Sequence, residues 1–251
     1  MKKYGKEIAI ALLFVIACLV FVLFEYVFVF SADETLDSLF KGALSRFVGF
    51  GLFAAIAVLC GLKDVFRIKA SPRVLLWCVP CLLVAVCNFP FSALLSGEMR
   101  ITRPELLWLF ALDCIGIGLF EEMLFRGILL PLTIDLLKKH NVVVPILINA
   151  AVFGLWHLCN LLAGASVGAT LLQTGYSFLI GAMLSCVFVR TKSVWWCVIL
   201  HAVFDFGGLL TGTVATGNCH DTVFWILTAI AGVLCFAHLL AYFVRHWKER
   251  E

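Results

Sequence analysis

The chain has 251 residues, of which 63% are hydrophobic and 14% charged. A soluble domain of this size does not need so much apolar surface, and runs of about 20 apolar residues, each long enough to cross a bilayer as a helix, recur along the whole chain. Period-two alternation, the mark of a membrane β-barrel, is not seen. The net charge of +3 is spread over the loops, which fits contact with lipid headgroups and does not indicate a nucleic-acid partner. The composition therefore predicts an all-α, polytopic membrane protein embedded in a lipid bilayer.

Hydropathy predicts about eight transmembrane helices. In chain order they cover residues 8–30, 42–62, 74–95, 106–128, 144–162, 168–189, 194–211 and 222–244. The first follows the basic start "MKKYGK", as a signal peptide would, but its apolar run is too long for a signal peptide. We therefore expect an uncleaved membrane anchor there.

Basic residues predict the orientation of these helices. With eight spans, most lysines and arginines fall in loops on one side, and the other side holds Lys41, Arg46, Arg100 and Arg103 beside several acids. The positive-inside rule then predicts a multi-pass protein of the cell membrane with both termini in the cytoplasm. The residues on the basic side are Lys2, Lys3, Lys6, Lys63, Arg67, Lys69, Arg73, Lys138, Lys139, Arg190, Lys192, Arg245, Lys248 and Arg250.

Most of the eleven cysteines lie inside the predicted helices, where a thiol behaves as a small apolar side chain. Cys78 and Cys81, in "CVPC", have the spacing of a redox pair, but no thioredoxin-like context surrounds them. We favour packing over redox chemistry for this pair.

Three ionisable residues interrupt the fourth predicted helix in "LFEEMLFRG". Glu122 and Arg126 are four residues apart with the acid first, the favourable order for an ion pair on a helix. Glu121 lies about 100° round the helix and is less well placed for Arg126. A glutamate without a cation in an apolar site suits a general base. The alternative is a helix end at the membrane surface, with all three side chains reaching water.

Two later helices carry histidines. "FGLWH" places Phe153 and His157 on one face of a helix, with Asn160 a turn further on. A lone histidine is more often a packing residue than a ligand. "HAVFD" places His201 and Asp205 one turn apart, so that the carboxylate can orient the imidazole. Ionisable pairs inside a membrane helix are candidates for function.

The depths of these residues in the membrane connect them. The fourth and fifth predicted helices form a hairpin that turns near residues 138–141, which brings Glu121 and His157 to similar depth. If Gly127 and Pro131 end or kink the fourth helix, Glu121 also falls in the cytoplasmic half. His201 lies about 10 Å into its helix from the same side. One buried pocket is therefore predicted.

Together these motifs resemble the CPBP intramembrane proteases, a family that includes CAAX prenyl endopeptidases and bacterial (Abi-type) members linked to bacteriocin processing or self-immunity. The family pattern is EExxxR, then FxxxH, then HxxxN or HxxxD, and the similarity covers roughly residues 105–210. Residues 1–104 would then form a variable region of three helices, residues 105–211 the catalytic core, and residues 212–251 a last helix with a basic tail.

The resemblance implies an endopeptidase that hydrolyses a membrane-embedded or membrane-tethered peptide. Glu121 and His157 would activate a water molecule, and His201 with Asp205 would stabilise the oxyanion. Glu122 and Arg126 would be supports or help to position substrate. Because a carboxylate only accepts hydrogen bonds, Asp205 either is protonated or orients His201, and we favour the second role.

Two questions stay open at this stage. Glu121, His157 and His201 form a set that zinc accepts, but we favour water activation without a metal or other cofactor, since no HExxH motif is present. A proton-coupled transporter or immunity protein without hydrolysis is the main alternative function, since buried glutamates and histidines also relay protons. A peptide-binding scaffold is a third.

Overall fold

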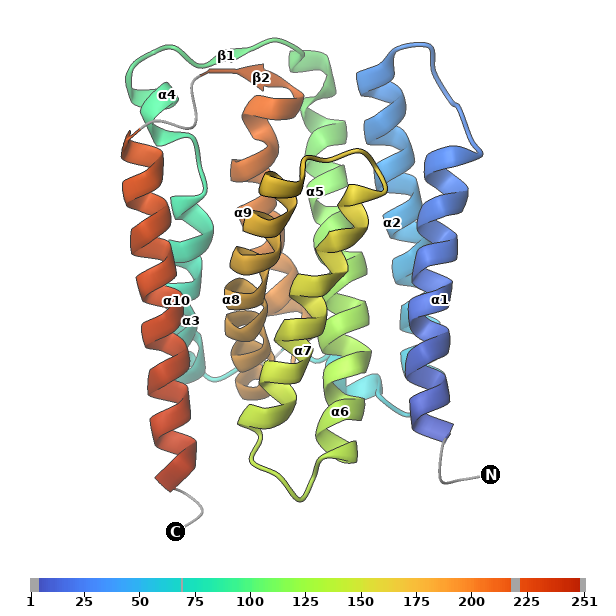
Figure 1. Ribbon diagram of the computed structural model, residues 1–251, viewed down its shortest axis with the longest axis vertical. Coiled ribbons are helices and arrows are strands. Elements are labelled where there is room, and N and C mark those ends of the chain that lie inside the picture. Colours follow the sequence, from blue (N-terminus) through green and yellow to red (C-terminus); the bar gives the residue numbers. More distant parts are fainter. Residues whose placement is uncertain (1–4, 69, 218–221, 249–251) are drawn as a thin grey trace.

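The computed structural model describes residues 5–68, 70–217 and 222–248, and it shows a bundle of long helices lying side by side (Figure 1). The helices and strands in chain order are α1 (Gly5–Tyr26), α2 (Glu34–Leu59), η1 (Lys63–Val65), α3 (Pro72–Cys87), α4 (Phe91–Leu95), β1 (Arg100–Ile101), η2 (Pro104–Leu106), α5 (Leu107–Glu122), η3 (Met123–Leu129), α6 (Leu130–Leu136), α7 (Val143–Trp156), η4 (His157–Leu161), α8 (Val167–Thr191), α9 (Val194–Thr213), β2 (Ala215–Thr216) and α10 (Thr222–Lys248). The predicted all-α class is confirmed.

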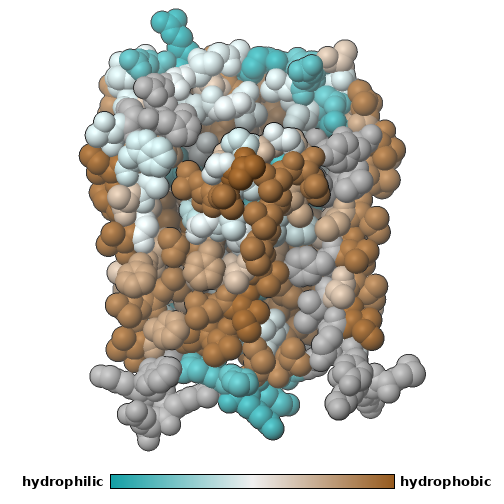
Figure 2. Space-filling view, in the orientation of Figure 1, coloured by the Kyte–Doolittle hydropathy of each residue, from teal (hydrophilic) through white to brown (hydrophobic). Residues whose placement is uncertain are grey.

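The bundle is a polytopic membrane protein by the length and hydropathy of its helices. Within the described residues, five helical segments are long and apolar enough to cross a bilayer, namely Glu34–Leu59, Val143–Leu161, Val167–Thr191, Val194–Thr213 and Thr222–Arg245. Figure 2 shows the matching surface, with a hydrophobic middle and hydrophilic residues towards both ends. The count of eight spans stays a prediction, although each predicted range overlaps a helix.

Two predicted helices differ from the expected course. The third range, 74–95, is divided, because α3 ends at Cys87 and Pro90 precedes the separate helix α4. The fourth range continues past 128: α5 passes into the π-helix η3, and α6 carries the helical backbone on to Leu136. Gly127 therefore does not end the helix, and Pro131 lies in the first turn of α6, where a missing N–H is tolerated.

The helix order places both ends of the described chain on one side of the bundle. The start of α1, the end of α10 and the α2–α3, α6–α7 and α8–α9 connections all lie at the lower end in Figure 1. At the opposite end β1 pairs antiparallel with β2, with Arg100 opposite Thr216. The predicted basic loops therefore share one end of the molecule; Lys2, Lys3, Lys69 and Arg250 lie outside the described residues.

Glycines allow the helices that carry the polar motifs to approach closely. A Cβ atom on Gly118 of α5 would lie 2.9 Å from the Val198 carbonyl oxygen of α9. A Cβ atom on Gly154 of α7 would lie 2.8 Å from the Thr174 carbonyl oxygen of α8. These two contacts bring α5 against α9 and α7 against α8, which are the helices that surround the site.

Candidate active site

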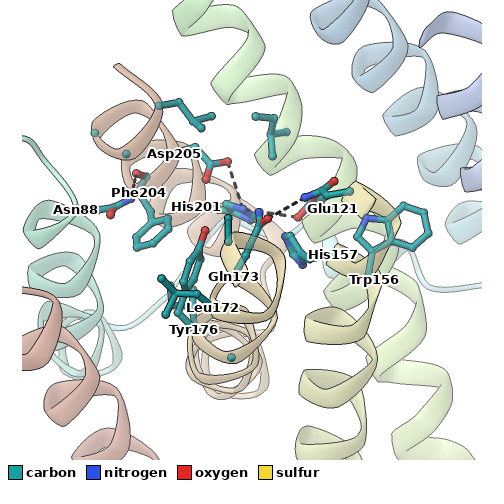
Figure 3. Close-up of a pocket in the computed structure, with 18 of the residues that line it drawn as sticks. Asn88, Glu121, Trp156, His157, Leu172, Gln173, Tyr176, His201, Phe204 and Asp205 are labelled. Atoms are coloured by element: carbon teal, nitrogen blue, oxygen red, sulfur yellow. Dashed lines mark hydrogen bonds and ion pairs between the residues drawn. The ribbon is translucent and has the colours of Figure 1, made fainter. Parts of the chain in front are cut away.

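A cavity of about 1010 Å³ opens among the helices, and all four predicted catalytic residues line it. Glu121 comes from the end of α5, His157 from the end of α7, and His201 and Asp205 from α9 (Figure 3). The predicted supporting residue Asn160, in η4, lines it as well. Residues 80 positions apart in the chain thus meet in one hollow inside the bundle.

The predicted pair of Glu122 and Arg126 is present and has no exposed surface. Arg126 Nη1 donates to Glu122 Oε1 over 2.7 Å, and Nη2 donates to the Gly181 carbonyl of α8 over 2.9 Å. The guanidinium carbon lies 4.3 Å from the centre of the Phe153 ring, the distance of a cation–π contact. Phe153, a predicted supporting residue, thus covers the ion pair from α7.

His201 is held by Glu122, which is a difference from the sequence prediction. The Nδ1 atom of His201 lies 2.7 Å from Glu122 Oε1, and because a carboxylate only accepts, Nδ1 is the donor. The Nε2 atom lies 3.4 Å from Asp205 Oδ2 and 3.8 Å from Glu121 Oε2. Asp205 is therefore beside Nε2, while Glu122 accepts the hydrogen bond from Nδ1. The i,i+4 spacing of His201 and Asp205 predicted that their side chains meet. It did not determine which imidazole nitrogen faces the carboxylate.

His157 sits where α7 changes into the 3-10 turn η4. Its Nδ1 atom lies 2.9 Å from the Phe153 carbonyl oxygen, which can only accept, so Nδ1 carries the hydrogen. In the neutral imidazole, Nε2 is then an acceptor. The ring also packs edge-on against Phe153, with centroids 5.1 Å apart. This arrangement leaves His157 a fixed ring with one basic nitrogen.

Helix α8 contributes polar residues that sequence reasoning did not single out. Asn160 donates through Nδ2 to Gln173 Oε1 over 2.8 Å, which ties η4 to α8. Tyr176, one turn after Gln173, also lines the cavity, and its ring lies 6.1 Å from that of Phe204. Figure 3 shows its hydroxyl directed towards His201 and Asp205. The only sequence signal for Gln173 and Tyr176 was their spacing of three residues within an apolar helix.

The N-terminal helices also reach the site, although residues 1–104 were predicted to lie outside the core. Asn88, which follows α3, donates through Nδ2 to the Phe204 carbonyl oxygen over 2.8 Å. Arg46 lines the cavity from inside α2, not from a loop as expected, and contacts Asp113 of α5. Gly42 leaves room for this pair, since a Cβ atom there would meet both side chains.

The cavity extends away from the end that holds the termini. Its lining includes Leu162 and Ala163 of the α7–α8 connection and Phe224 and Trp225 of the first turn of α10, all towards the upper half in Figure 1. The sequence had placed the pocket on the cytoplasmic side. The α7–α8 connection stops short of the end formed by β1 and β2 (Figure 1).

Glu121, His157 and His201 are the zinc ligands considered from the sequence. Within the described part of the chain, no group of three or more His, Cys, Asp and Glu side chains is arranged to hold a metal ion, and this includes Glu121, His157 and His201. Cys78 and Cys81 are both free thiols in α3. Water activation without a metal stays a prediction.

A membrane bundle with a glutamate, two histidines and an aspartate around an internal cavity defines a candidate intramembrane hydrolase. Residues 103–207 match the model of the family described as type II CAAX prenyl endopeptidase Rce1-like. The matched segment includes every motif residue from Glu121 to Asp205, and the match agrees with the resemblance to the CPBP/CAAX proteases. No curated protein and no solved structure matches the chain. The family match supports a CAAX-protease-like intramembrane endopeptidase.

Proposed function

We propose that this protein hydrolyses a peptide bond of a membrane-associated substrate, with Glu121 as the general base. The observation that carries the proposal is the position of this carboxylate. Its Oε2 atom is buried without a hydrogen-bond partner among the described residues, yet the side chain lines the same cavity as His157. Because Glu122 is already paired with Arg126, Glu121 is the member of the motif that is available to a water molecule.

The reaction needs one proton transfer in each direction. Glu121 takes a proton from water while His157 Nε2 accepts the second hydrogen of that water as a hydrogen bond and holds it. The water oxygen forms a bond to the scissile carbonyl carbon, and the π electrons move to the carbonyl oxygen. When this tetrahedral intermediate collapses, the C–N bond breaks and Glu121 returns the proton to the leaving amine.

His201 is suited to stabilising the negative oxygen. Glu122 fixes its Nδ1–H, and a hydrogen on Nε2 would point into the cavity, where the carbonyl oxygen becomes charged. The neighbouring carboxylates of Glu121 and Asp205 would stabilise the doubly protonated ring that this requires. Glu122 and Arg126 act through His201 and are positioning residues.

The proposed substrate is a peptide tethered to or embedded in the membrane, such as a prenylated C-terminal segment. A leader or bacteriocin-like peptide is the corresponding substrate if the protein acts in peptide processing or self-immunity. We propose the cell membrane as the location and the cytoplasm for both termini, because the predicted basic loops share one end of the bundle.

Peptide cleavage by the protein in liposomes tests the proposal. The probes are an internally quenched peptide with a prenylated cysteine four residues from its C-terminus and the same peptide without the lipid. We expect the wild type to cleave the prenylated probe, and Glu121→Ala and His157→Ala to be slower by roughly 10²–10⁴-fold. The exposed Glu98→Ala is the control. Equal product from the wild type and both site variants would refute hydrolysis at this site.

A further inference from the structure

The part of the cavity that Glu121, His201 and Asp205 line has many hydrogen-bond acceptors and few donors. The carboxylates of Glu121, Glu122 and Asp205 can only accept hydrogen bonds when ionised. His201 uses Nδ1 on Glu122, which leaves Nε2 as its one nitrogen for a substrate. Since the developing oxyanion in peptide hydrolysis is stabilised by donors aimed at it, the residues of the motif supply one donor where an oxyanion hole commonly has two.

Tyr176 of α8 is placed to supply the second donor. Its side chain lines the cavity and its ring lies against Phe204, the residue next to Asp205, with centroids 6.1 Å apart. Its hydroxyl is directed towards His201 and Asp205 in Figure 3. Asp205 and Glu121 line the same cavity as Tyr176, so the hydroxyl shares the space in which the scissile carbonyl would bind.

We infer that the Tyr176 hydroxyl is a further catalytic group, which donates a hydrogen bond to the oxyanion beside His201. This inference rests on the proposed hydrolysis. When water adds to the carbonyl carbon and the π electrons move to oxygen, the Tyr176 O–H donates to that oxygen and keeps its proton. When the intermediate collapses and the C–N bond breaks, the restored carbonyl is a weaker acceptor. The contact is therefore stronger in the transition state than with substrate.

The carboxylate at position 205 gives this inference a specific second test. An asparagine there would have nearly the same shape and would add an N–H donor beside His201 Nε2, where the carboxylate has none. If Tyr176 compensates for the missing donor, Asp205→Asn should restore part of the activity that Tyr176→Phe removes. A tyrosine that only packs against Phe204 would not be rescued in this way.

The experiment measures kcat and KM for the prenylated probe in liposomes. We expect Tyr176→Phe to lower kcat by about 10²-fold, the effect of removing one oxyanion donor, with KM within about threefold of the wild-type value. Thr174→Val, which removes a hydroxyl of α8 that donates to the Thr170 carbonyl within the helix, is the matched control and should leave kcat unchanged. The double variant with Asp205→Asn should recover at least roughly tenfold of the lost kcat. Thermal unfolding of every variant checks that each one folds.

Several results would overturn the inference. Wild-type kcat in Tyr176→Phe, or a double variant as slow as Tyr176→Phe alone, would show that the hydroxyl does not act on the oxyanion. The proposed function fails separately: if the wild type and Glu121→Ala release the same product, hydrolysis at this site is refuted and the role of Tyr176 with it. If Glu121→Ala is inactive while Tyr176→Phe is normal, only the role of Tyr176 is refuted.

Discussion

One oxygen atom, Oε1 of Glu122, connects two parts of the site. It accepts from Arg126 on its own helix and from His201 on α9, and all three side chains are buried. The arginine thereby neutralises the carboxylate that fixes the imidazole. An unpaired charge inside the membrane costs about 2.5–3.5 kcal/mol. The ion pair with Arg126 offsets this cost, and the same carboxylate holds His201.

Glu122→Gln should destabilise the protein strongly. The amide keeps the shape of the side chain but leaves Arg126 buried without a counter-ion, which costs about 3–5 kcal/mol. Thermal and denaturant unfolding in detergent would measure the change, with the exposed Glu98→Gln as the control. A Glu122→Gln protein as stable as that control would show that the ion pair does not support the fold.

Asp205→Asn should keep much of the activity in the presence of Tyr176. The reason is that Glu122, not Asp205, holds the Nδ1 atom of His201, so the imidazole stays oriented when the carboxylate is replaced. His201→Ala should lose about 10²–10³-fold in kcat, because it removes the oxyanion donor itself. Probe cleavage by the two variants side by side checks this. An Asp205→Asn protein as inactive as His201→Ala would contradict it.

At the scale of elements, the distance between α5 and α9 decides whether Glu121 and His201 meet. Gly118 makes this contact possible, because a side chain there would collide with the Val198 carbonyl of α9. We predict that Gly118→Ala costs about 1–3 kcal/mol of stability and also slows cleavage. Gly168→Ala, in the first turn of α8 with open space around the position, is the matched control. Equal unfolding temperatures for the two variants would refute the close-contact argument.

The elements show which local features the sequence could predict. Hydropathy located the helices, and the i,i+4 rule paired Glu122 with Arg126 correctly. The π-helix that follows Glu122 and the 3-10 turn that begins at His157 were not predicted, because neither has a distinctive residue pattern. The break at Pro90 could have been read from the proline, yet the apolar run around it obscured the signal.

At the scale of the whole molecule, the missed contacts are those between residues far apart in the chain. Asn88 and Phe204 are 116 positions apart, and each alone is an ordinary residue of an apolar segment. Motif spacing predicted Glu121, His157 and His201 as site residues because each belongs to a short sequence pattern within one or two helical turns. Tyr176 and Arg46 have no such local partner, so their place in the cavity could only follow from the packing of the bundle.

The end of the bundle opposite the termini carries a charge cluster that predicts an acid-dependent stability. Arg103 bonds both Asp33, at 2.7 Å, and Glu105, at 2.6 Å, and these hydrogen bonds lower the pKa of each carboxyl. A lowered pKa means that the stabilisation is present above the ordinary value of about 4 and is lost as the pH falls through the lower folded value. Arg103→Met removes the cause of this shift.

Unfolding temperatures of the wild type and Arg103→Met between pH 2 and pH 7 would test this cluster. We expect the wild type to be more stable near pH 6 and the difference to shrink as the pH falls below about 4. A difference that stays constant over this range would show that the carboxylates of Asp33 and Glu105 do not contribute through their charge.

The most direct test of the account is the rate at which Glu121→Gln cleaves the prenylated probe after exhaustive chelation, relative to the wild type treated in the same way. If Glu121 activates water without a metal, the chelated wild type keeps its full rate and Glu121→Gln is slower by roughly 10²–10⁴-fold. Equal rates for the two proteins would contradict the role of Glu121. A wild type that loses activity with its zinc, and regains it when zinc is restored, would contradict the metal-free mechanism.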